Sequence, residues 1–175
     1  MNDANRTDPG KEEIRSLILH LEQKDGLKRE HARHQLEKMG RRATPLLLEA
    51  LQSANKTVRW EAVKALQVIK DRNAVASLIE RLYDPEFEVR WLASEALIQL
   101  GYDAVILPLL TELKKDIRSE FLRNATHHIL RILSEKESLP DEAKKILCHV
   151  WSLEPELDFY KDVLDALERI KQKAQ

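Results

Sequence analysis

The histidines are the residues whose spacing could hold a metal ion. His31 and His34 lie three positions apart within the predicted helix Lys28–Met39 and would share one of its faces. His127 and His128 are adjacent, so their side chains would point about 100° apart on a helix. Unrelated histidines explain both pairs, and no histidine of the chain is directly followed by a glutamate. We therefore expect no metal site, no cofactor and no catalytic residue among them.

Cys148 is the one cysteine of the chain, which excludes an internal disulfide. It lies in the apolar stretch Ile146–Trp151, so we expect a buried and unreactive thiol. The chain has no Gly-rich phosphate loop, no HExxH and no GxSxG. These observations favour a binding protein over an enzyme.

Two tryptophans, Trp60 and Trp91, lie 31 positions apart and on the side of their predicted helices that faces away from the apolar stripe. Tryptophan is enriched among the residues that dominate protein interfaces, so the pair could bind a partner. Each indole could equally cover the edge of a neighbouring structural unit. Both interpretations stay open at this point.

A repeat positions these residues. The segment Val58–Leu66 returns 31 positions later as Val89–Leu97, beginning with Val-Arg-Trp and ending with Ala-Leu in both copies. Apolar residues recur on one face at helical spacing in each copy, which predicts an amphipathic helix, here called an A helix. Self-similarity with a period of about 20–50 residues is typical of solenoid proteins. The fold class is therefore all-α, an α-solenoid.

A second type of helix, the B helix, follows each A helix. Its leucine-rich triplet recurs every 31 positions, as Leu47, Leu48 and Leu51, as Leu78, Ile79 and Leu82, and as Leu109, Leu110 and Leu113. Weaker copies extend the pattern to a B helix at Glu12–Lys24 and, with an offset of 32, to an A helix at Phe121–Leu133. The last two segments, Asp141–Leu153 and Pro155–Lys173, have the B and A spacing. We expect about ten helices in four to five pairs.

Several residues mark the ends of these helices. We expect helices to begin at Thr44-Pro45 and at Asn73, and to stop near Gly26, Gly40 and Gly101. Pro108 falls inside a B helix and should cost it a hydrogen bond and bend it.

The A helix, with Val-Arg followed by Ala and Ala-Leu, and preceded in one copy by Asp84-Pro85, resembles the HEAT repeat in its short, phycobilisome-lyase-type form. The resemblance implies a right-handed superhelix with A helices outside and B helices lining the concave face. It also implies that Asp84 and Arg90 join a polar ladder between units, although Ser53 stands where the preceding unit would have the aspartate. Most such proteins are scaffolds, and a minority are enzymes, including bilin lyases.

The B helices would present polar side chains opposite their leucines. Extended concave surfaces are how solenoids bind partners, so we expect the partner-binding residues to be Glu49, Gln52, Glu80, Tyr83, Thr111 and Lys114, with Trp60 and Trp91 as the outer alternative.

Composition narrows the class of partner. The net charge is −1 with 34% charged residues of both signs, so no cluster of cations favours nucleic acid. Apolar runs are too short to span a membrane and the first residues do not resemble a signal peptide, so we expect a cytoplasmic protein. We expect a disordered leader over residues 1–10 and a single repeat domain over 11–175.

These features together predict a non-enzymatic scaffold or adaptor that binds another protein or a peptide segment. The alternative, which the resemblance alone implies, is a bilin-lyase-like enzyme or accessory subunit. A module that binds nucleic acid ranks third.

Overall fold

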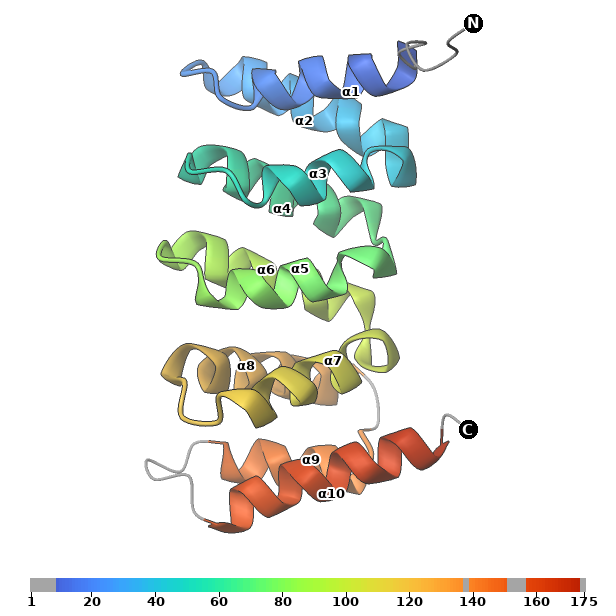
Figure 1. Cartoon of the computed structure of the whole chain (residues 1–175), viewed down its shortest axis with the longest axis vertical. Coiled ribbons are helices and arrows are strands. Elements are labelled where there is room, and N and C mark those ends of the chain that lie inside the picture. Colours follow the sequence, from blue (N-terminus) through green and yellow to red (C-terminus); the bar gives the residue numbers. More distant parts are fainter. Residues whose placement is uncertain (1–8, 137–138, 151–156, 174–175) are drawn as a thin grey trace, which may run out of the picture. The chain divides into compact units, whose positions relative to one another are not determined.

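The computed structural model describes residues 9–136, 139–150 and 157–173, and every regular element within these ranges is a helix (Figure 1). Ten of these elements are α-helices, as the repeat predicts. Their bounds are α1 Pro9–His20, α2 Gly26–Met39, α3 Thr44–Ala50, α4 Lys56–Ile69, α5 Val75–Glu80, α6 Phe87–Leu100, α7 Tyr102–Lys115, α8 Glu120–Lys136, α9 Asp141–His149 and α10 Leu157–Lys173. Short 3₁₀ turns occupy Gly40–Arg42, Arg72–Ala74 and Arg81–Tyr83. None of the helices in the described ranges is both long and apolar enough to cross a bilayer.

The chain divides into two compact units, Met1–Ala74 and Val75–Gln175. The single repeat domain expected over residues 11–175 stays a prediction. Residues 1–8 of the expected leader lie outside the described residues, while Pro9 and Gly10 already belong to α1.

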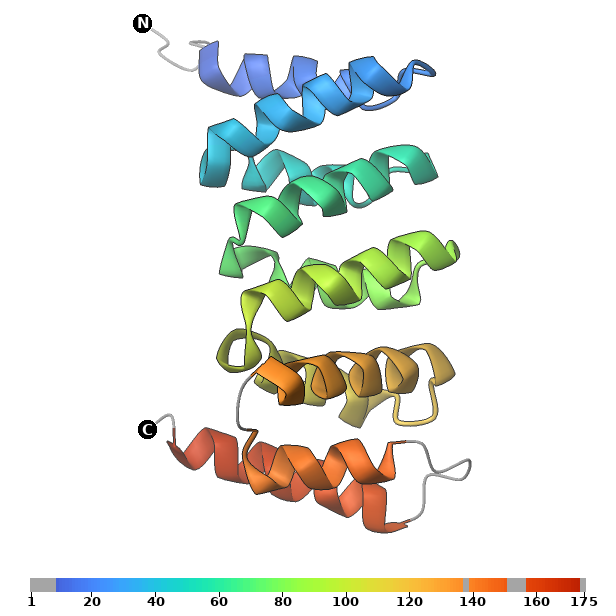
Figure 2. The same ribbon diagram turned by 180° about the vertical axis from the view of Figure 1, so that it is seen from behind.

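The first unit consists of two helix layers. Helix α1 packs on α3, and α2 packs on α4, which runs beside it when the molecule is seen from behind (Figure 2). The layers meet through contacts of α1 with α2 and of α3 with α4. Fully buried leucines fill the space between them, among them Leu21, Leu36, Leu47 and Leu66. A single pair could not bury this surface, so stacking stabilises the unit.

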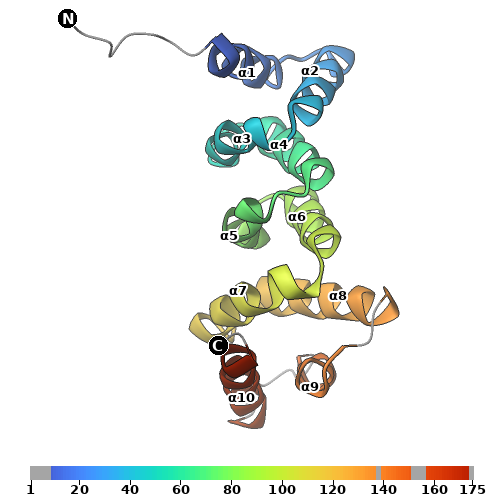
Figure 3. The same cartoon turned by 90° about the vertical axis from the view of Figure 1, so that its right-hand side faces the viewer.

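The second unit has the same two layers but ends differently from the prediction. Helix α7 packs on α5 and on α10, whereas α8 packs on α6 and on α9 (Figure 3). The assignment of the last two segments as B and then A is therefore wrong, because α9 continues the A layer and α10 the B layer. A helical wheel identifies the apolar face of a helix, but the A and B stripes are equally broad, so the wheel does not determine which layer a helix joins.

The register of α8 also differs from the prediction. At the start of α8 the offset from α6 is 33 rather than 32, since Leu122 and not Phe121 takes the buried place of Val89, and Ile129 and Leu130 then take the places of Ala96 and Leu97. Phe121 consequently leaves the apolar stripe and is half exposed. Position 93, alanine in α6, is taken in α8 by Thr126, whose side chain is fully buried. The extra residue is absorbed in the connection before α8.

The helix ends explain part of the local sequence. Asp25 and Asn55 are N-caps, with side chains that accept hydrogen bonds from the Leu27 and Thr57 amides at 3.0 and 2.9 Å. Gly40 and Gly101 adopt φ of +60° and +84° at the ends of α2 and α6, as predicted.

Two of the predicted boundary signals are wrong. Gly26 is the first residue of α2 rather than the end of the helix before it. At the turn before α5, Asp71 rather than Asn73 supplies the side chain that accepts an amide hydrogen bond. Helix α3 does begin at Thr44-Pro45, although the buried Thr44 hydroxyl has no hydrogen-bond partner among the described residues. Pro108 lies inside α7 as predicted, and the helix runs on through it to Lys115.

An arginine near the start of each of the A helices α2, α4 and α6 holds the preceding loop. The Nη1 of Arg29 donates to the carbonyls of Gln23 and Lys24 at 2.8 and 2.9 Å, and Arg59 does the same to Ser53 and Ala54 at 2.9 and 3.1 Å. Arg90 donates to Asp84 and Pro85 at 2.6 and 3.0 Å. The repeated Val-Arg therefore fixes the loop between pairs, because two otherwise unpaired carbonyls gain a charged donor.

The buried alanines set the spacing between neighbouring A helices. Ala93 on α6 is fully buried, so replacing Ala93 with leucine should overpack the core and lower the free energy of unfolding by about 1–3 kcal/mol. Ala76 on α5 is exposed, so Ala76→Leu, the same chemical change, should have little effect. Urea unfolding followed by circular dichroism compares the two, and equal midpoints would contradict this placement of Ala93.

Candidate protein-binding site

Three aromatic side chains of α6 and α8 are exposed on one surface of the second unit. Phe87 is 62% exposed, Trp91 47% and Phe121 50%, and we call these three residues the aromatic patch. They line a pocket of about 290 Å³, together with Arg90, Glu120, Asn124 and His128. Large apolar side chains that gather around a pocket are unusual on a solvated surface and mark sites of interaction.

Ring contacts hold Trp91 in place. Its ring centroid lies 6.4 Å from that of Phe87, one turn earlier on α6, and 4.5 Å from that of His128 on α8. His128 Nε2 lies 2.7 Å from the Glu95 carboxylate. Trp91 thus packs against α8, a helix of the next repeat, and about half of its indole still faces outward.

Arg90 connects the patch to the loop that it holds. Its guanidinium carbon lies 4.3 Å from the Phe121 ring centroid and 5.8 Å from that of Phe87. The same guanidinium donates to the Asp84 and Pro85 carbonyls. These contacts fix the two phenylalanines at low entropic cost, which preorganises the patch for a partner.

The side chain of Asp84 stabilises the turn that precedes α6. Its carboxylate accepts a hydrogen bond from the Glu86 amide at 3.0 Å and lies 3.6 Å from Arg81. Ser53 makes the corresponding turn in the first unit, where its hydroxyl accepts from the Asn55 amide at 3.1 Å. Serine thus reproduces the local turn of the aspartate.

Trp60 occupies the corresponding place on α4. Its side chain is only partly exposed, and the Lys64 ammonium lies 4.1 Å from the ring centroid. No second exposed aromatic residue of the first unit's A layer accompanies it among the described residues. The two tryptophans therefore differ in their surroundings, although their repeats match.

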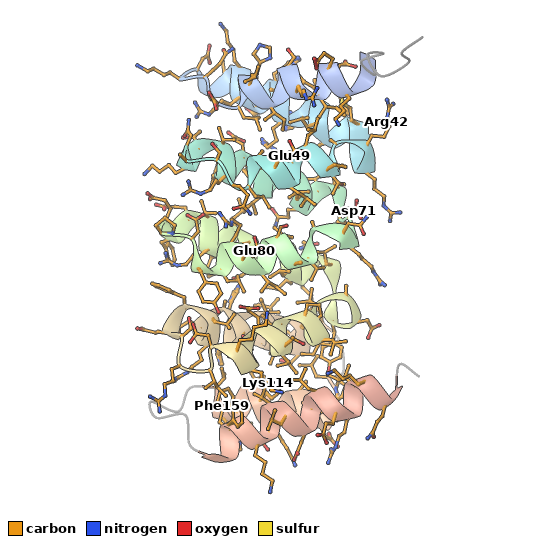
Figure 4. The ribbon with its side chains drawn as sticks, viewed as in Figure 1. Arg42, Glu49, Asp71, Glu80, Lys114 and Phe159 are labelled. Carbon is orange, nitrogen blue, oxygen red and sulfur yellow. The ribbon has the colours of Figure 1, made fainter. Side chains whose placement is uncertain are left out.

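The predicted B-helix residues are mostly solvated. Figure 4 shows Glu49 on α3 in the first unit, and Glu80 and Lys114 on α5 and α7 in the second. Glu49, Gln52, Glu80, Thr111 and Lys114 are all exposed. Glu49 borders a groove of about 350 Å³ between α1 and α3, which Arg15, Leu19 and Glu22 also line.

Tyr83 is the exception, since its hydroxyl is buried and no partner meets hydrogen-bond geometry. Burial raises the pKa of Tyr83 to about 12, with the carboxylates of Glu112 and Asp116 adding to the rise and the Ser119 hydroxyl opposing it. Glu80 and Tyr83 thus do not form one open surface, and the part of Tyr83 that could bind a partner is its ring.

This buried phenol predicts a loss of stability at alkaline pH. The folded state keeps the proton of Tyr83 up to a pKa of about 12, whereas the free phenol has a pKa of 10.0. The contribution of Tyr83 is therefore complete below pH 10 and is lost as the pH rises toward 12. Urea unfolding across this range should show a steeper fall for the wild type than for Tyr83→Phe, and identical curves would contradict the prediction.

The structure places the two histidine pairs on different helices, His31 and His34 on α2 and His127 and His128 on α8. His31 and His34 are exposed, and His34 lies at 3.9 and 4.0 Å from Glu30 and Glu37. No cluster of three or more His, Cys, Asp or Glu side chains in the described ranges is arranged to hold a metal ion. Burial, and then the charges of Arg131 and His128, lower the pKa of His127.

Cys148 is exposed, so the expectation of a buried thiol is wrong. On α9 the buried positions are Glu142, Ala143 and Ile146, and Cys148 faces away from them. The helix is amphipathic, and the apolar letters around Cys148 do not all share its buried face.

Phe87 and Phe121 are the site residues that sequence reasoning missed. Phe87 lies one helical turn before Trp91, so the i, i+4 spacing could have placed both on one face. Phe121 could not have been found this way, because only the observed offset of 33 moves it out of the core.

Known structures share this fold. A chain in the complex of CpcE and CpcF of phycocyanin lyase from Nostoc matches with a TM-score of 0.62 and 22% identity, covering 89% of this chain and 98% of that one. An engineered protein and a designed armadillo repeat protein match with TM-scores of 0.44 and 0.39, at 20% and 16% identity, covering 97% and 90% of this chain and 80% and 99% of theirs. No curated protein sequence matches the chain.

One protein family matches the amino-acid sequence directly. The family of HEAT repeats matches residues 14–98 and 44–131, which together include every helix from α2 to α7 and most of α8. The matched region exceeds half of the chain and contains both Val-Arg-Trp copies. The chain therefore belongs to the HEAT-repeat family.

Proposed function

We propose that this protein is a non-enzymatic HEAT-repeat module that binds another protein, and that the aromatic patch is its main docking surface. The observation that carries the proposal is the exposure of Phe87, Trp91 and Phe121 around one pocket. Aromatic residues supply much of the energy of protein interfaces, and rigid ones lose little entropy when they bind.

The electrostatics of the pocket support a binding role. An enzyme needs convergent groups with perturbed pKa values in a cleft. Two polar side chains of the pocket are instead bonded within the fold, Arg90 to the Asp84 and Pro85 carbonyls and His128 to Glu95. The pocket thus offers a ligand aromatic rings with polar side chains, among them Glu120 and Asn124, beside them, which suits recognition.

The B-helix face is the second docking surface. The exposed residues predicted for it, including Glu80 and Lys114, are polar. Polar residues at the rim of an interface contribute less than a buried aromatic anchor. We therefore place the predicted B-face residues at the periphery of binding rather than at its centre.

A pair of variants tests the proposal. The tagged full chain captures partners from native lysate by cross-linking, and the captured protein is then purified and titrated. Phe87→Ser with Trp91→Ser should weaken its binding by more than about 2 kcal/mol, the scale of an interface hot spot. Glu80→Ala with Lys114→Ala, at exposed positions of α5 and α7, should change it little.

Circular dichroism of each variant serves as the control that the variant remains folded. Binding that is lost with the Glu80 and Lys114 pair and kept with the aromatic pair would move the interface to the B face. Capture that no variant reduces would refute both surfaces.

A second candidate function is that of a subunit in a lyase complex. The observation in its favour is the match to the CpcE and CpcF complex, which covers nearly the whole length of that chain. Copurification of the chain with a second HEAT-repeat protein, followed by an assay of chromophore attachment to phycocyanin, would test it. Attachment without the second protein, or none with it, would count against this candidate.

A further inference from the structure

Two carboxylates near the aromatic patch make no ion pair within the described part of the fold: Glu120, which lines the pocket, and Glu88, which lies between Phe87 and Trp91 in the sequence of α6. Glu88 lies in the first turn of α6 and Glu120 in the first turn of α8, and both are exposed. Neither makes an ion pair or a side-chain hydrogen bond with any described residue. Glu120 lines the pocket itself. A partner that approaches the rings therefore meets two available negative charges.

Arg90, the cation that lines the pocket, is in contrast already hydrogen-bonded within the fold. Arg90 donates to the Asp84 and Pro85 carbonyls at 2.6 and 3.0 Å, and its guanidinium is 4.3 Å from the Phe121 ring centroid. Its guanidinium keeps its charge but is held by partners within the fold, whereas the carboxylates of Glu88 and Glu120 are still available to a partner. Charge complementarity at a rim selects the partner and speeds its approach.

The rings themselves favour a cation. The negative face of an aromatic ring attracts a guanidinium or ammonium group. Phe121 already holds a guanidinium, that of Arg90, and Trp60 holds the ammonium of Lys64 at 4.1 Å. Of the rings in the aromatic patch, the indole of Trp91 attracts a cation most strongly, and Trp91 is 47% exposed.

We propose that the aromatic patch binds a short basic segment of the partner protein, with one apolar side chain in the pocket and an adjacent lysine or arginine over Trp91 and beside Glu88 and Glu120. This inference rests on the proposed function and names the chemistry of the partner. A pocket of about 290 Å³ has room for one large side chain rather than for a helix face.

Two other occupants fit less well. An acidic segment would bring its carboxylates to Glu88 and Glu120, and like charges in contact are costly. A second copy of this chain, docked patch against patch across a two-fold axis, would bring the same carboxylates together from both sides. The basic segment alone pairs them.

Selection from a random peptide library on the immobilised full chain tests the inference. The wild type should enrich peptides in which an aromatic or aliphatic residue adjoins lysine or arginine. The enriched peptide is then synthesised with a fluorescent label, and its Kd is measured by anisotropy at low and high salt. Glu88→Gln with Glu120→Gln should weaken binding at least tenfold, and added salt should weaken the wild type toward the same value.

Matched controls separate charge from position. Glu13→Gln with Glu168→Gln removes the same charge from two exposed positions of α1 and α10 and should leave Kd within a factor of two. Glu88→Lys with Glu120→Lys should select acidic peptides instead. Phe87→Ser with Trp91→Ser should abolish enrichment of the basic peptides.

Each remaining outcome overturns the inference. Enrichment of acidic peptides by the wild type, or a Kd insensitive to the Glu88 and Glu120 pair, would refute the basic partner but leave a protein-binding function intact. Basic peptides that still bind the Phe87 and Trp91 variant would place binding elsewhere. A wild-type dimer in light scattering that the Phe87 and Trp91 variant dissociates would identify a second copy as the occupant. An absence of any enrichment would remove the peptide site altogether.

Discussion

Replacing Glu61 with alanine is expected to lower the free energy of unfolding by about 3–5 kcal/mol, because it leaves the buried Nε of Arg33 without its carboxylate partner. Glu61 on α4 accepts a hydrogen bond from Arg33 Nε at 2.9 Å and lies 3.4 Å from Arg29 Nε. Arg33 is 7% exposed and also donates to Glu37 at 2.6 Å. These four charges join α2 to α4 in the first unit.

Glu30 provides the control for this prediction. Its carboxylate lies 3.7 Å from the same Arg33, but its side chain is 52% exposed, so Glu30→Ala should cost at most about 1 kcal/mol. Urea unfolding followed by circular dichroism measures both. Equal losses would show that the Glu61 carboxylate is solvated.

The double variant Arg33→Met with Glu61→Leu separates the charge from the packing. It removes both buried charges at similar volume and should recover most of the loss, since a buried ion pair is roughly as stabilising as a well-packed apolar pair. If the double variant were as unstable as Glu61→Ala, the loss of stability would come from altered packing rather than from the unpaired charge.

The sequence predicted the two helices that carry this ion-pair network but not the network itself. The helices α2 and α4 were both predicted, with α2 beginning two residues earlier than expected. Arg33 occupies the position that Val63 and Ser94 hold in the later repeats. Because an arginine is charged, nothing in its own helix indicates that it is buried. Its burial depends on Glu61 from another helix, and a single sequence does not reveal such a pairing.

The candidate site was predicted only in part, for a related reason. Trp91 was found because it repeats Trp60, and its packing against the next unit was one of the two open interpretations. Phe121 was assigned to the core because an offset of 32 fits its apolar neighbours almost as well as 33 does. An inserted residue in a loop rotates the whole helix by about 100°, and only the packing of α8 on α6 fixes that rotation.

Phe159 provides the second large prediction, and it concerns the helix whose layer was predicted wrongly. Phe159 on α10 is 2% exposed (Figure 4), and Phe159→Ala should cost about 3–5 kcal/mol through lost apolar burial and the cavity left behind. Tyr160, the next residue of the same helix, is 37% exposed, so Tyr160→Ala should cost far less. Urea unfolding compares the two, and similar midpoints would show that α10 does not cap the second unit.

Hydrogen exchange then distinguishes the two possible places of α10. Because α10 packs on α7 and α9, Phe159→Ala should speed amide exchange in those two helices at denaturant concentrations that leave α6 and α8 protected. An A-layer helix, as the sequence pattern predicts, would instead have α8 as its neighbour in the stack, and α8 would lose protection first. Faster exchange in α8 with α7 unchanged would therefore restore the original assignment. Faster exchange in α7, whose buried Leu109 and Leu113 the loosened helix would uncover, would establish that the B layer of this unit ends in α10.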